Sequence, residues 1–241
     1  MNIYNLILES TRKCNIQCAH CLRGSVQRMN CSSEVIYKLF SQIDSISMFT
    51  ITGGEPSLVP EVIENIYNEI MYHKVDIGSI YCVSNGHIHN KYRAFLEAFS
   101  KIYNIVDEQD DGMSQLSISM DQFHSPFWDE KYLYKLMDYQ ENEFPFINLE
   151  SRKKIIRYVI SEGRGAKISG SREYSNYGIE FDEDGNMIEG ELYVSANGNV
   201  VFNCNMSYNS IDKHYIGNIL EESLSDMFDR YREKKEVVEA A

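Results

Sequence analysis

The chain has 241 residues, of which 43% are hydrophobic and 12% aromatic, so it can bury a sizeable core in one large domain or in one domain with an appendage. Its formal net charge of -13 at pH 7 argues against a broad surface for duplex nucleic acid or for an anionic membrane. The first residues carry no basic stretch before an apolar one, and no later segment approaches the ~20 apolar residues that cross a bilayer. We therefore predict a soluble, cytoplasmic protein.

Short apolar runs alternate with amphipathic segments along the first two thirds of the chain. The pattern predicts strands over residues 3–9, 47–52, 78–84, 114–120 and 154–161, and helices over residues 32–43, 61–74, 91–103 and 127–139. Ser32 or Ser33 would cap the first of these helices. Right-handed crossovers make such strands parallel, with the helices outside, so the expected fold class is α/β. A curled, incomplete barrel suits this strand count better than a closed one.

The pattern changes after about residue 166. A polar stretch, residues 166–178, is typical of a loop, and residues 191–204 predict a β-hairpin that turns at Asn197-Gly198, a pair that can adopt positive φ angles. The segment from Ile219 onward predicts a helix whose apolar face carries Leu220, Leu224, Phe228 and Tyr231. We therefore divide the chain into a core, residues 1–165, and a small C-terminal extension of loop, hairpin and helix, residues 166–241.

Three cysteines, Cys14, Cys18 and Cys21, lie in CNIQCAHC directly after the first predicted strand, at the end of a parallel sheet where active sites form. Six cysteines are too few and too unevenly placed for a secreted disulfide framework, so this cluster of three suggests a metal site. Three thiolates can bind three irons of a [4Fe-4S] cube and leave the fourth iron open to a ligand. The alternative is a zinc site with His20 or Cys31 as its fourth ligand, because zinc and iron-sulfur sites share such spacings.

The sequence TGGEP, residues 52–56, follows the second predicted strand, and its two glycines would let the backbone approach a ligand closely. Its backbone groups would suit a ligand that carries an ammonium group. A glycine-rich turn alone is weak evidence, but CNIQCAHC after the first strand and TGGEP after the second together resemble the radical S-adenosylmethionine (SAM) enzymes. The resemblance covers residues 1 to about 165 and implies a partial (βα)6 TIM-like barrel with a [4Fe-4S] cluster and SAM as cofactors.

The resemblance also assigns residues to the two cofactors. The cluster ligands would be Cys14, Cys18 and Cys21, and the segment that holds the methionine amino group would be Gly53, Gly54, Glu55 and Pro56. Polar contacts to the nucleoside and its ribose would come from Ser84, Asn85, Ser119 and Asp121, at the ends of the third and fourth strands. Arg164, after the fifth, could pair with the methionine carboxylate. The residue before the last cysteine is often aromatic in the family, and His20 stands there in this chain.

The reaction implied by the resemblance is the reductive cleavage of SAM, whose 5′-deoxyadenosyl radical abstracts hydrogen from a substrate. An electron donor such as flavodoxin or ferredoxin would supply the electron. His124, beside the end of the fourth strand, is a candidate substrate contact or acid-base group, and equally a structural histidine between Phe123 and Pro126. The reaction subtype and the attacked carbon do not follow from the sequence.

The hairpin, a cysteine, then IGNI and a helix resemble a degenerate form of the SPASM or twitch-like extension of peptide-modifying members. A ribosomally made peptide or protein is therefore the first predicted substrate, and a small metabolite or nucleotide is the alternative. A noncatalytic zinc-binding interaction module is the alternative from another class. Cys204 is the only cysteine after Cys82, so we expect no second cluster; it is either a core residue or a vestige near the substrate mouth. Cys31 and Cys82 are expected to be buried or free thiols.

Overall fold

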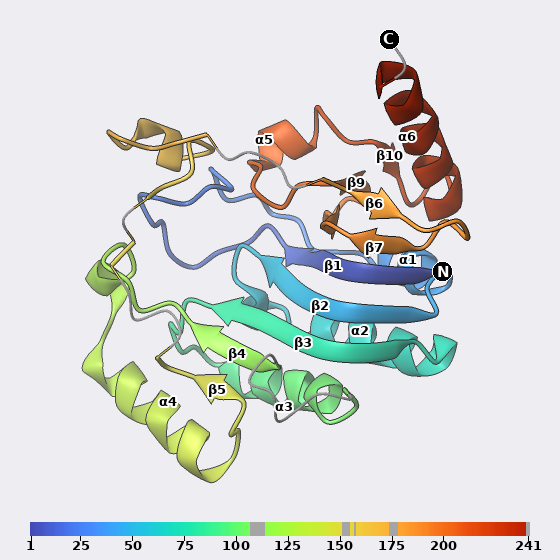
Figure 1. Ribbon diagram of the computed structural model, residues 1–241. Coiled ribbons are helices and arrows are strands. Elements are labelled where there is room, and N and C mark those ends of the chain that lie inside the picture. The colour runs from blue at the N-terminus through green and yellow to red at the C-terminus, as the bar shows by residue number, and fades with distance from the viewer. Residues whose placement is uncertain (107–113, 151–154, 157, 174–177, 240–241) are drawn as a thin grey trace.

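A computed structural model describes residues 1–106, 114–150, 155–156, 158–173 and 178–239 (Figure 1). The strands are β1 (Asn2–Thr11), β2 (Ser45–Gly53), β3 (Asp76–Ser84), β4 (Gln115–Ile118), β5 (Ile147–Asn148), β6 (Glu180–Phe181), β7 (Met187–Glu189), β8 (Leu192–Val194), β9 (Asn199–Val201) and β10 (Gly217–Asn218). The helices are α1 (Ser33–Phe40), α2 (Pro60–His73), α3 (Tyr92–Tyr103), α4 (Glu130–Asn142), α5 (Tyr208–Ile211) and α6 (Leu224–Glu239). Short 3-10 turns are η1 (Pro56–Leu58), η2 (Ser125–Phe127) and η3 (Gly165–Lys167).

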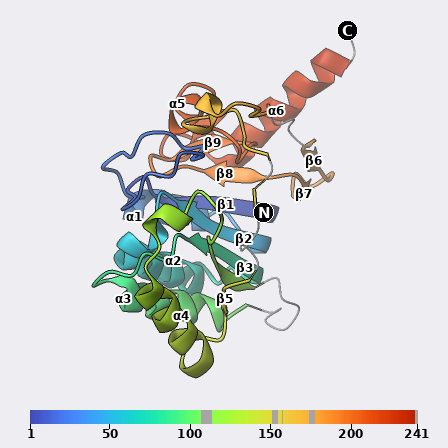
Figure 2. The same cartoon turned by 90° about the vertical axis from the view of Figure 1, so that its left-hand side faces the viewer.

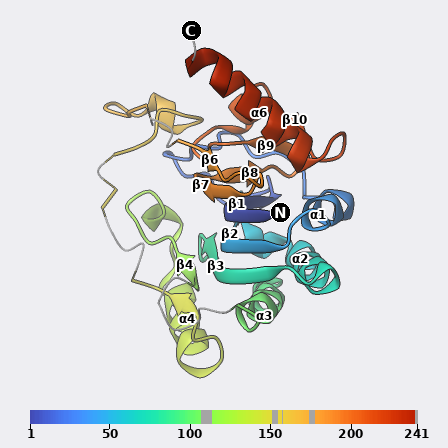
Figure 3. The same ribbon diagram turned by 45° about the vertical axis from the view of Figure 1, so that its right-hand side comes forward.

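Strands β1 to β5 lie in chain order and are parallel, which confirms the α/β fold class. Helices α1, α2 and α3 lie side by side on one face of this sheet (Figures 2 and 3). Ser32 is the residue that caps α1, because its side chain accepts a hydrogen bond from the Val35 N–H. The core fills the space between sheet and helices, and its fully buried strand residues include Leu6, Leu8, Phe49, Ile51 and Ile80.

The fifth strand is not where the sequence pattern predicts it. The observed β5 pairs with β4 through Leu116 and Ile147, whereas the prediction of a strand over residues 154–161 is wrong for the residues described there. In that stretch Ile160 forms only an isolated bridge to Arg172, and residues 154 and 157 lie outside the described residues. The physical reason is burial: Ile155 is 78% exposed, whereas Phe146, Ile147 and Leu149 are buried. The acidic stretch 107–112, whose charges predict a solvated loop, also lies outside the described residues.

The C-terminal extension continues the same sheet beyond β1. The sheet order is β10-β9-β8-β1-β2-β3-β4-β5, with β7 also beside β1 and β6 beside β7. The predicted hairpin is confirmed: β8 and β9 are antiparallel, and β8 is parallel to β1. Of the expected turn pair only Gly198 has a positive φ, at +85°, and Asn197 does not. The boundary at residues 165 and 166 stays a prediction, but the two parts share one hydrogen-bonded sheet.

The predicted C-terminal helix is present as α6, although it begins later than the apolar pattern suggests. Leu224 and Phe228 are buried against the core, whereas Leu220 precedes the helix and is 39% exposed. Packing against the extension strands, rather than helical spacing, selects which apolar residues are covered. None of the helices in the described part of the chain combines the length and the apolar character that a membrane span requires.

Candidate active site

A cavity of about 340 Å³ opens beyond the carboxyl ends of β1, β2 and β3. In Figure 1 the arrowheads of β1 to β4 point toward the side of the molecule where the loop after β1 lies. Of the residues predicted for the site, those that line the cavity are Cys14, Cys18, Cys21, Gly53, Gly54, Glu55, Asn85, Ser119, His124 and Arg164. Pro56, Ser84 and Asp121 are not among its lining residues. The topology therefore brings most of the predicted site together, as expected at the carboxyl edge of a parallel sheet.

The three cysteines lie in a loop whose thiols are partly or fully buried. Burial raises the pKa of Cys14 to about 11, and the negative charge of Glu55 and the neighbouring Cys21 add to it. Burial likewise raises the pKa of Cys18 to about 12. These thiols therefore stay protonated at neutral pH unless a cation offsets the cost of their ionisation, which is the situation that a bound metal provides.

The separation of the sulfur atoms discriminates between the two metal sites that the sequence allows. Zinc bonds sulfur at 2.3 Å in a tetrahedron, which places sulfurs about 3.8 Å apart. Among the described residues, the sulfur atoms of Cys14, Cys18 and Cys21 do not all lie within 4.8 Å of one another. Cys31 lies in the hydrophobic core and does not line the cavity. The donor set fits an iron-sulfur cluster, which has a separate metal atom for each thiolate, better than a single zinc ion.

The two glycines of TGGEP pack against the residues that precede Cys14. A Cβ added at Gly53 would collide with the carbonyl oxygen of Thr11, and one added at Gly54 with that of Lys13. Gly53 also has a φ of +150°, which disfavours any other residue. The Gly54 N–H donates to Thr11 O at 2.7 Å, and the Glu55 N–H donates to Lys13 O at 2.8 Å. The glycines therefore fix the start of the cysteine loop. Their contact with a ligand stays a prediction.

The Glu55 side chain joins the carboxyl ends of β2 and β3. Its carboxylate accepts hydrogen bonds from the Ser57 N–H at 3.1 Å, the Ser84 hydroxyl at 2.8 Å and the Asn85 N–H at 2.8 Å. Burial raises the pKa of Glu55 in spite of these donors. Ser84 is fully buried and also contacts the Tyr92 hydroxyl at 3.1 Å. The Ser84 hydroxyl therefore has its partners within the protein, and Ser84 does not line the cavity in which the sequence analysis expected it to contact a nucleoside.

Asn85 lines the cavity and also contacts the cysteine loop. Its side-chain NH₂ donates to Asn15 Oδ1 at 2.8 Å and lies 3.9 Å from Cys14 Sγ. Ser119, the other predicted polar contact on the cavity wall, is almost fully buried and its carbonyl accepts from the Trp128 indole N–H at 3.2 Å. Both residues line the cavity, and their contact with a nucleoside stays a prediction.

Arg164 clamps the cysteine loop. Its Nε donates to Cys18 O at 2.8 Å, its Nη1 donates to Gly24 O, and its main-chain N–H donates to Cys21 O at 2.9 Å. The preceding Gly163, at a φ of +56°, lies so close to Leu22 O that an added Cβ would collide with it. Among the described residues, Nε and Nη1 of Arg164 have hydrogen-bond acceptors, so only Nη2 could bind the predicted methionine carboxylate. The contacts seen in the structure hold the cysteine loop.

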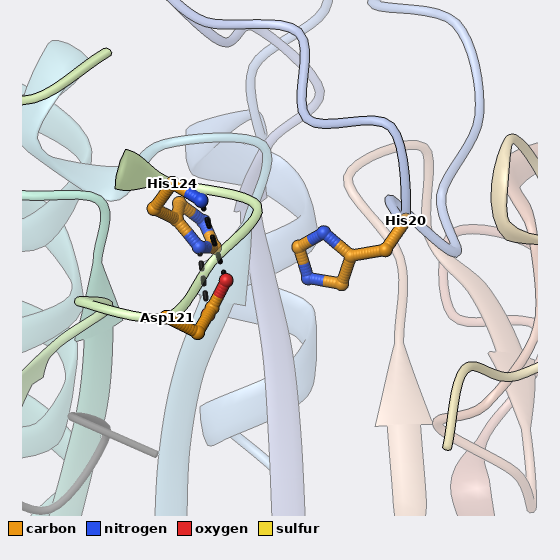
Figure 4. A group of neighbouring side chains, drawn as sticks. All are labelled: His20, Asp121 and His124. Carbon is orange, nitrogen blue, oxygen red and sulfur yellow. Dashed lines mark hydrogen bonds and ion pairs between the residues drawn. The ribbon is translucent and has the colours of Figure 1, made fainter. Parts of the chain in front are cut away.

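Asp121 orients His124 toward the cavity (Figure 4). Its Oδ2 lies 2.8 Å from His124 Nδ1, and its Oδ1 accepts from the Phe123 N–H at 2.9 Å. Burial alone would raise the pKa of Asp121, but the bonds from His124 and Phe123 outweigh it and lower the pKa below its ordinary value. Asp121 does not line the cavity, whereas His124 does. The carboxylate is therefore a partner of the histidine and does not face the space where the sequence analysis placed a ribose.

His20 reaches the same place from the cysteine loop, and Figure 4 shows its ring facing the Asp121-His124 pair. The ring stacks on Phe123 with centroids 4.4 Å apart and meets the His124 ring edge-on at 5.2 Å. One ligand atom from each of His20, Asp121 and His124 lies within 4.8 Å of the others. The group is thus compact enough to hold a cation, and it also gives the cavity an aromatic wall.

Sequence reasoning missed the wall that the extension contributes. The extension contributes Cys204, Asn205 and Tyr208 to the cavity lining, and Arg12 and Arg23 of the core line the cavity as well. Cys204 lines the cavity and also packs against a small buried cluster that includes Ile7 and Tyr193, so both alternatives stay open, and burial raises its pKa to about 12. Arg12 directly follows β1, which is a signal for an active-end position. Nothing local to Tyr208 marks it, because its place depends on how the extension folds back.

Among known proteins, this chain has matches in structure but not in sequence. No protein-family model matches the chain, and no curated protein matches it significantly. Native anSMEcpe with bound AdoMet and Kp18Cys peptide matches with a TM-score of 0.56 at 14% identity over 95% of this chain and 80% of that one. The same enzyme with AdoMet and Cp18Cys peptide gives a TM-score of 0.51, also at 14% identity over 95% and 80% of the two chains. Streptococcus suis SuiB bound to precursor peptide SuiA matches at 0.49 with 12% identity, over 93% of this chain and 64% of that one.

These matches show that the chain has the fold of radical SAM enzymes, a partial parallel barrel followed by extension strands. They confirm the resemblance drawn from CNIQCAHC and TGGEP at the level of the fold. With identity this low, the likeness leaves the reaction and the substrate to be argued from the site itself.

Proposed function

We propose that the protein is a radical SAM enzyme that acts on a ribosomally made peptide or protein. The observation that carries the proposal is the set of three cavity-lining thiols after β1, spaced too widely for one ion and backed by the glycine turn of β2. Cys14, Cys18 and Cys21 would hold a [4Fe-4S] cluster, and SAM would bind beside Gly53, Gly54 and Glu55. When bound, these cofactors would supply one-electron cleavage of SAM and a radical that takes hydrogen from carbon.

The chain's own residues would position and shield this chemistry. Arg164 and Gly54 hold the cysteine loop at the end of β1, so the three thiols stay at fixed places on the cavity wall. Apolar side chains, among them Ile7, Ile16 and Val26, line much of the cavity and help to exclude water. The residues of the extension close one side of the cavity, so a substrate would lie between them and the cofactor.

His124 is the proposed acid-base group at the substrate. Asp121 binds its Nδ1, which leaves Nε2 as the ring nitrogen able to exchange a proton with a ligand in the cavity. Asn85 and Ser119 remain the proposed polar contacts to the nucleoside of SAM. A flavodoxin or ferredoxin is the proposed source of the electron.

The fold supports a peptide or protein as the substrate class. The anSMEcpe structures that match this chain are complexes with AdoMet and a peptide, and the match extends over 95% of this chain, which includes the extension. A fold shared with a peptide-bound enzyme over the extension as well supports a peptide or protein substrate for this chain. A small metabolite or nucleotide is the competing substrate class.

The proposal is tested with anaerobically reconstituted enzyme, SAM and a strong reductant. We expect 5′-deoxyadenosine from the wild type and from Cys31→Ala, a matched change in the core, but none from Cys18→Ala. Incubation with a short peptide encoded beside the gene then addresses the substrate. An unchanged peptide mass despite 5′-deoxyadenosine formation would favour a small molecule, and retained cleavage by Cys18→Ala would contradict the cluster assignment.

A further inference from the structure

Two buried arginines line the cavity next to the extension, and only one of them is neutralised by carboxylates. Arg12 is fully buried and lies between two acids. Its Nε contacts Glu9 at 2.7 Å, and its Nη1 and Nη2 contact the two Asp212 oxygens at 2.7 and 2.9 Å. The positive charge of Arg12 is therefore fully paired within the protein, which leaves it nothing to offer a ligand.

Arg23 is buried at the same wall without such a partner. It is 9% exposed, its Nη1 donates to Met206 O at 2.7 Å, and its guanidinium lies 4.5 Å from the centre of the Tyr193 ring. No carboxylate of a described residue lies within 4.0 Å of it, and its Nε and Nη2 have no hydrogen-bond partner among those residues. A buried guanidinium stays charged, and Arg23 has no carboxylate in direct contact among the described residues, so an anion in the cavity would gain an ion pair with it.

The Tyr208 hydroxyl is a second unsatisfied group in the same wall. Tyr208 is 2% exposed, and its buried hydroxyl has no hydrogen-bond partner among the described residues. The Tyr208 N–H donates to Arg23 O at 3.2 Å, which ties the two residues together through the main chain. A buried phenolic hydroxyl normally has a partner, so its absence within the protein points to a ligand.

The nearby carboxylates are engaged elsewhere and do not cover the open edge of Arg23. Glu9 accepts from Arg12 and, at 2.6 Å, from the Tyr193 hydroxyl. Glu191 lies by Cys204, whose N–H donates to it at 3.4 Å. Glu162, on the segment that clamps the cysteine loop, accepts from the Ser207 N–H and the Ser210 hydroxyl.

We infer that Arg23 and Tyr208 form a binding site for an anionic group of the substrate, a carboxylate or a phosphate. The Nε and Nη2 of an arginine carry two parallel N–H groups, the arrangement that binds a carboxylate through both oxygens, and the Tyr208 hydroxyl is a further donor on the same cavity wall. Cys204 and Asn205 line the cavity beside them, so the site belongs to the extension side of the cavity. That the anion is part of a substrate rests on the proposed function, whereas the anion site is a property of the folded chain.

Two simple anions serve as probes for this site, N-acetylglutamate amide for a carboxylate and inorganic phosphate for a phosphate. Calorimetric titration of the folded, reconstituted protein should show that at least one of them binds with a dissociation constant of about a millimolar, while the neutral N-acetylglutamine amide does not. Arg23→Gln should weaken the binding at least tenfold and Tyr208→Phe about tenfold. Arg23→Lys, which keeps the charge but loses the fork, should weaken the carboxylate probe more than phosphate.

Arg28→Gln is the matched control, because Arg28 is an exposed arginine of the same loop. It should leave the affinity for the probes unchanged. Failure of the wild type to bind either anion, or equal binding by wild type and Arg23→Gln, would overturn the inference. An equal loss of SAM affinity in Arg23→Gln would assign the arginine to the methionine carboxylate and overturn it as well. Arg23-dependent anion binding by a wild type that does not cleave SAM would uphold the site and refute the proposed function.

Discussion

Replacing Arg12 by methionine should destabilise the whole fold, because this side chain joins the end of β1 to the extension. Its partners are Glu9 on β1 and Asp212 just after α5, 200 residues further along the chain. The substitution leaves Glu9, which is fully buried, without its counter-ion, whereas Asp212 keeps about a third of its side chain exposed to water.

The expected size of the effect follows from that difference in burial. Loss of one partner from a buried ion pair typically costs 3–5 kcal/mol, and we expect about 3 kcal/mol because Glu9 retains the hydrogen bond from Tyr193. In a chain of this length, 1 kcal/mol shifts the melting temperature by about 2–4 °C, so Arg12→Met should melt roughly 6–12 °C lower. Urea unfolding followed by circular dichroism measures the same change as a lower midpoint with an unchanged slope.

Arg93→Met is the matched control. Arg93 also contacts two carboxylates, those of Glu97 and Glu143, but its side chain is 52% exposed and water replaces the lost contacts. Its midpoint should therefore move far less. If Arg12→Met unfolds no earlier than Arg93→Met, or if it melts the extension alone in a separate transition, the network does not bind the extension to the core as described.

Three further predictions concern the cysteine loop and its surroundings. Gly54→Ala should lower the free energy of unfolding by about 1–3 kcal/mol, and with it the urea midpoint and the iron content, because the new Cβ meets Lys13 O. Gly178→Ala, whose Cβ would meet no described residue within 4 Å, should change neither the midpoint nor the iron content. Arg164→Ala should lose at least half of its iron during anaerobic gel filtration, whereas Arg172→Ala, an exposed arginine stacked on a tyrosine, should keep it. Asp121→Asn should cost stability at pH 6. The folded pKa of Asp121 is lowered, so its carboxylate contributes its full share of the stability above the unfolded pKa of about 4. This contribution shrinks as the pH falls through the folded pKa. The gap between the urea midpoints of wild type and Asp121→Asn should therefore be smaller at pH 3 than at pH 6.

The parts of the fold that could be predicted are those in which local pattern and burial agree. Helices α1 to α4 and strands β1 to β4 follow from apolar periodicity, because each buries one continuous face against its neighbours. The stretch 154–161 fails for the opposite reason. Its apolar residues have the composition of a strand, but Ile155 and Tyr158 lie exposed, and only the three-dimensional context tells that the two-residue β5 is the strand that pairs with β4.

The site shows the same division. The cysteines and the glycine turn are short motifs at the ends of strands, so their convergence follows from the parallel topology. The side-chain partners, whether near or far along the chain, do not follow from it. Asp121 binds His124, Arg164 binds the Cys18 carbonyl, and Arg12 binds Asp212, and each pairing depends on side-chain directions that no spacing encodes. The anion-binding pair is a similar case, since Arg23 and Tyr208 meet only because β8 joins the sheet beside β1.

The most direct test of the proposed chemistry is the response of the bound metal to SAM. Protein reconstituted without oxygen should hold about four irons per chain, lose them in Cys14→Ala, Cys18→Ala and Cys21→Ala but not in Cys31→Ala, and change its electron paramagnetic resonance spectrum when SAM is added to the reduced form. Zinc in place of iron, or an iron spectrum that SAM leaves unaltered, would contradict the account.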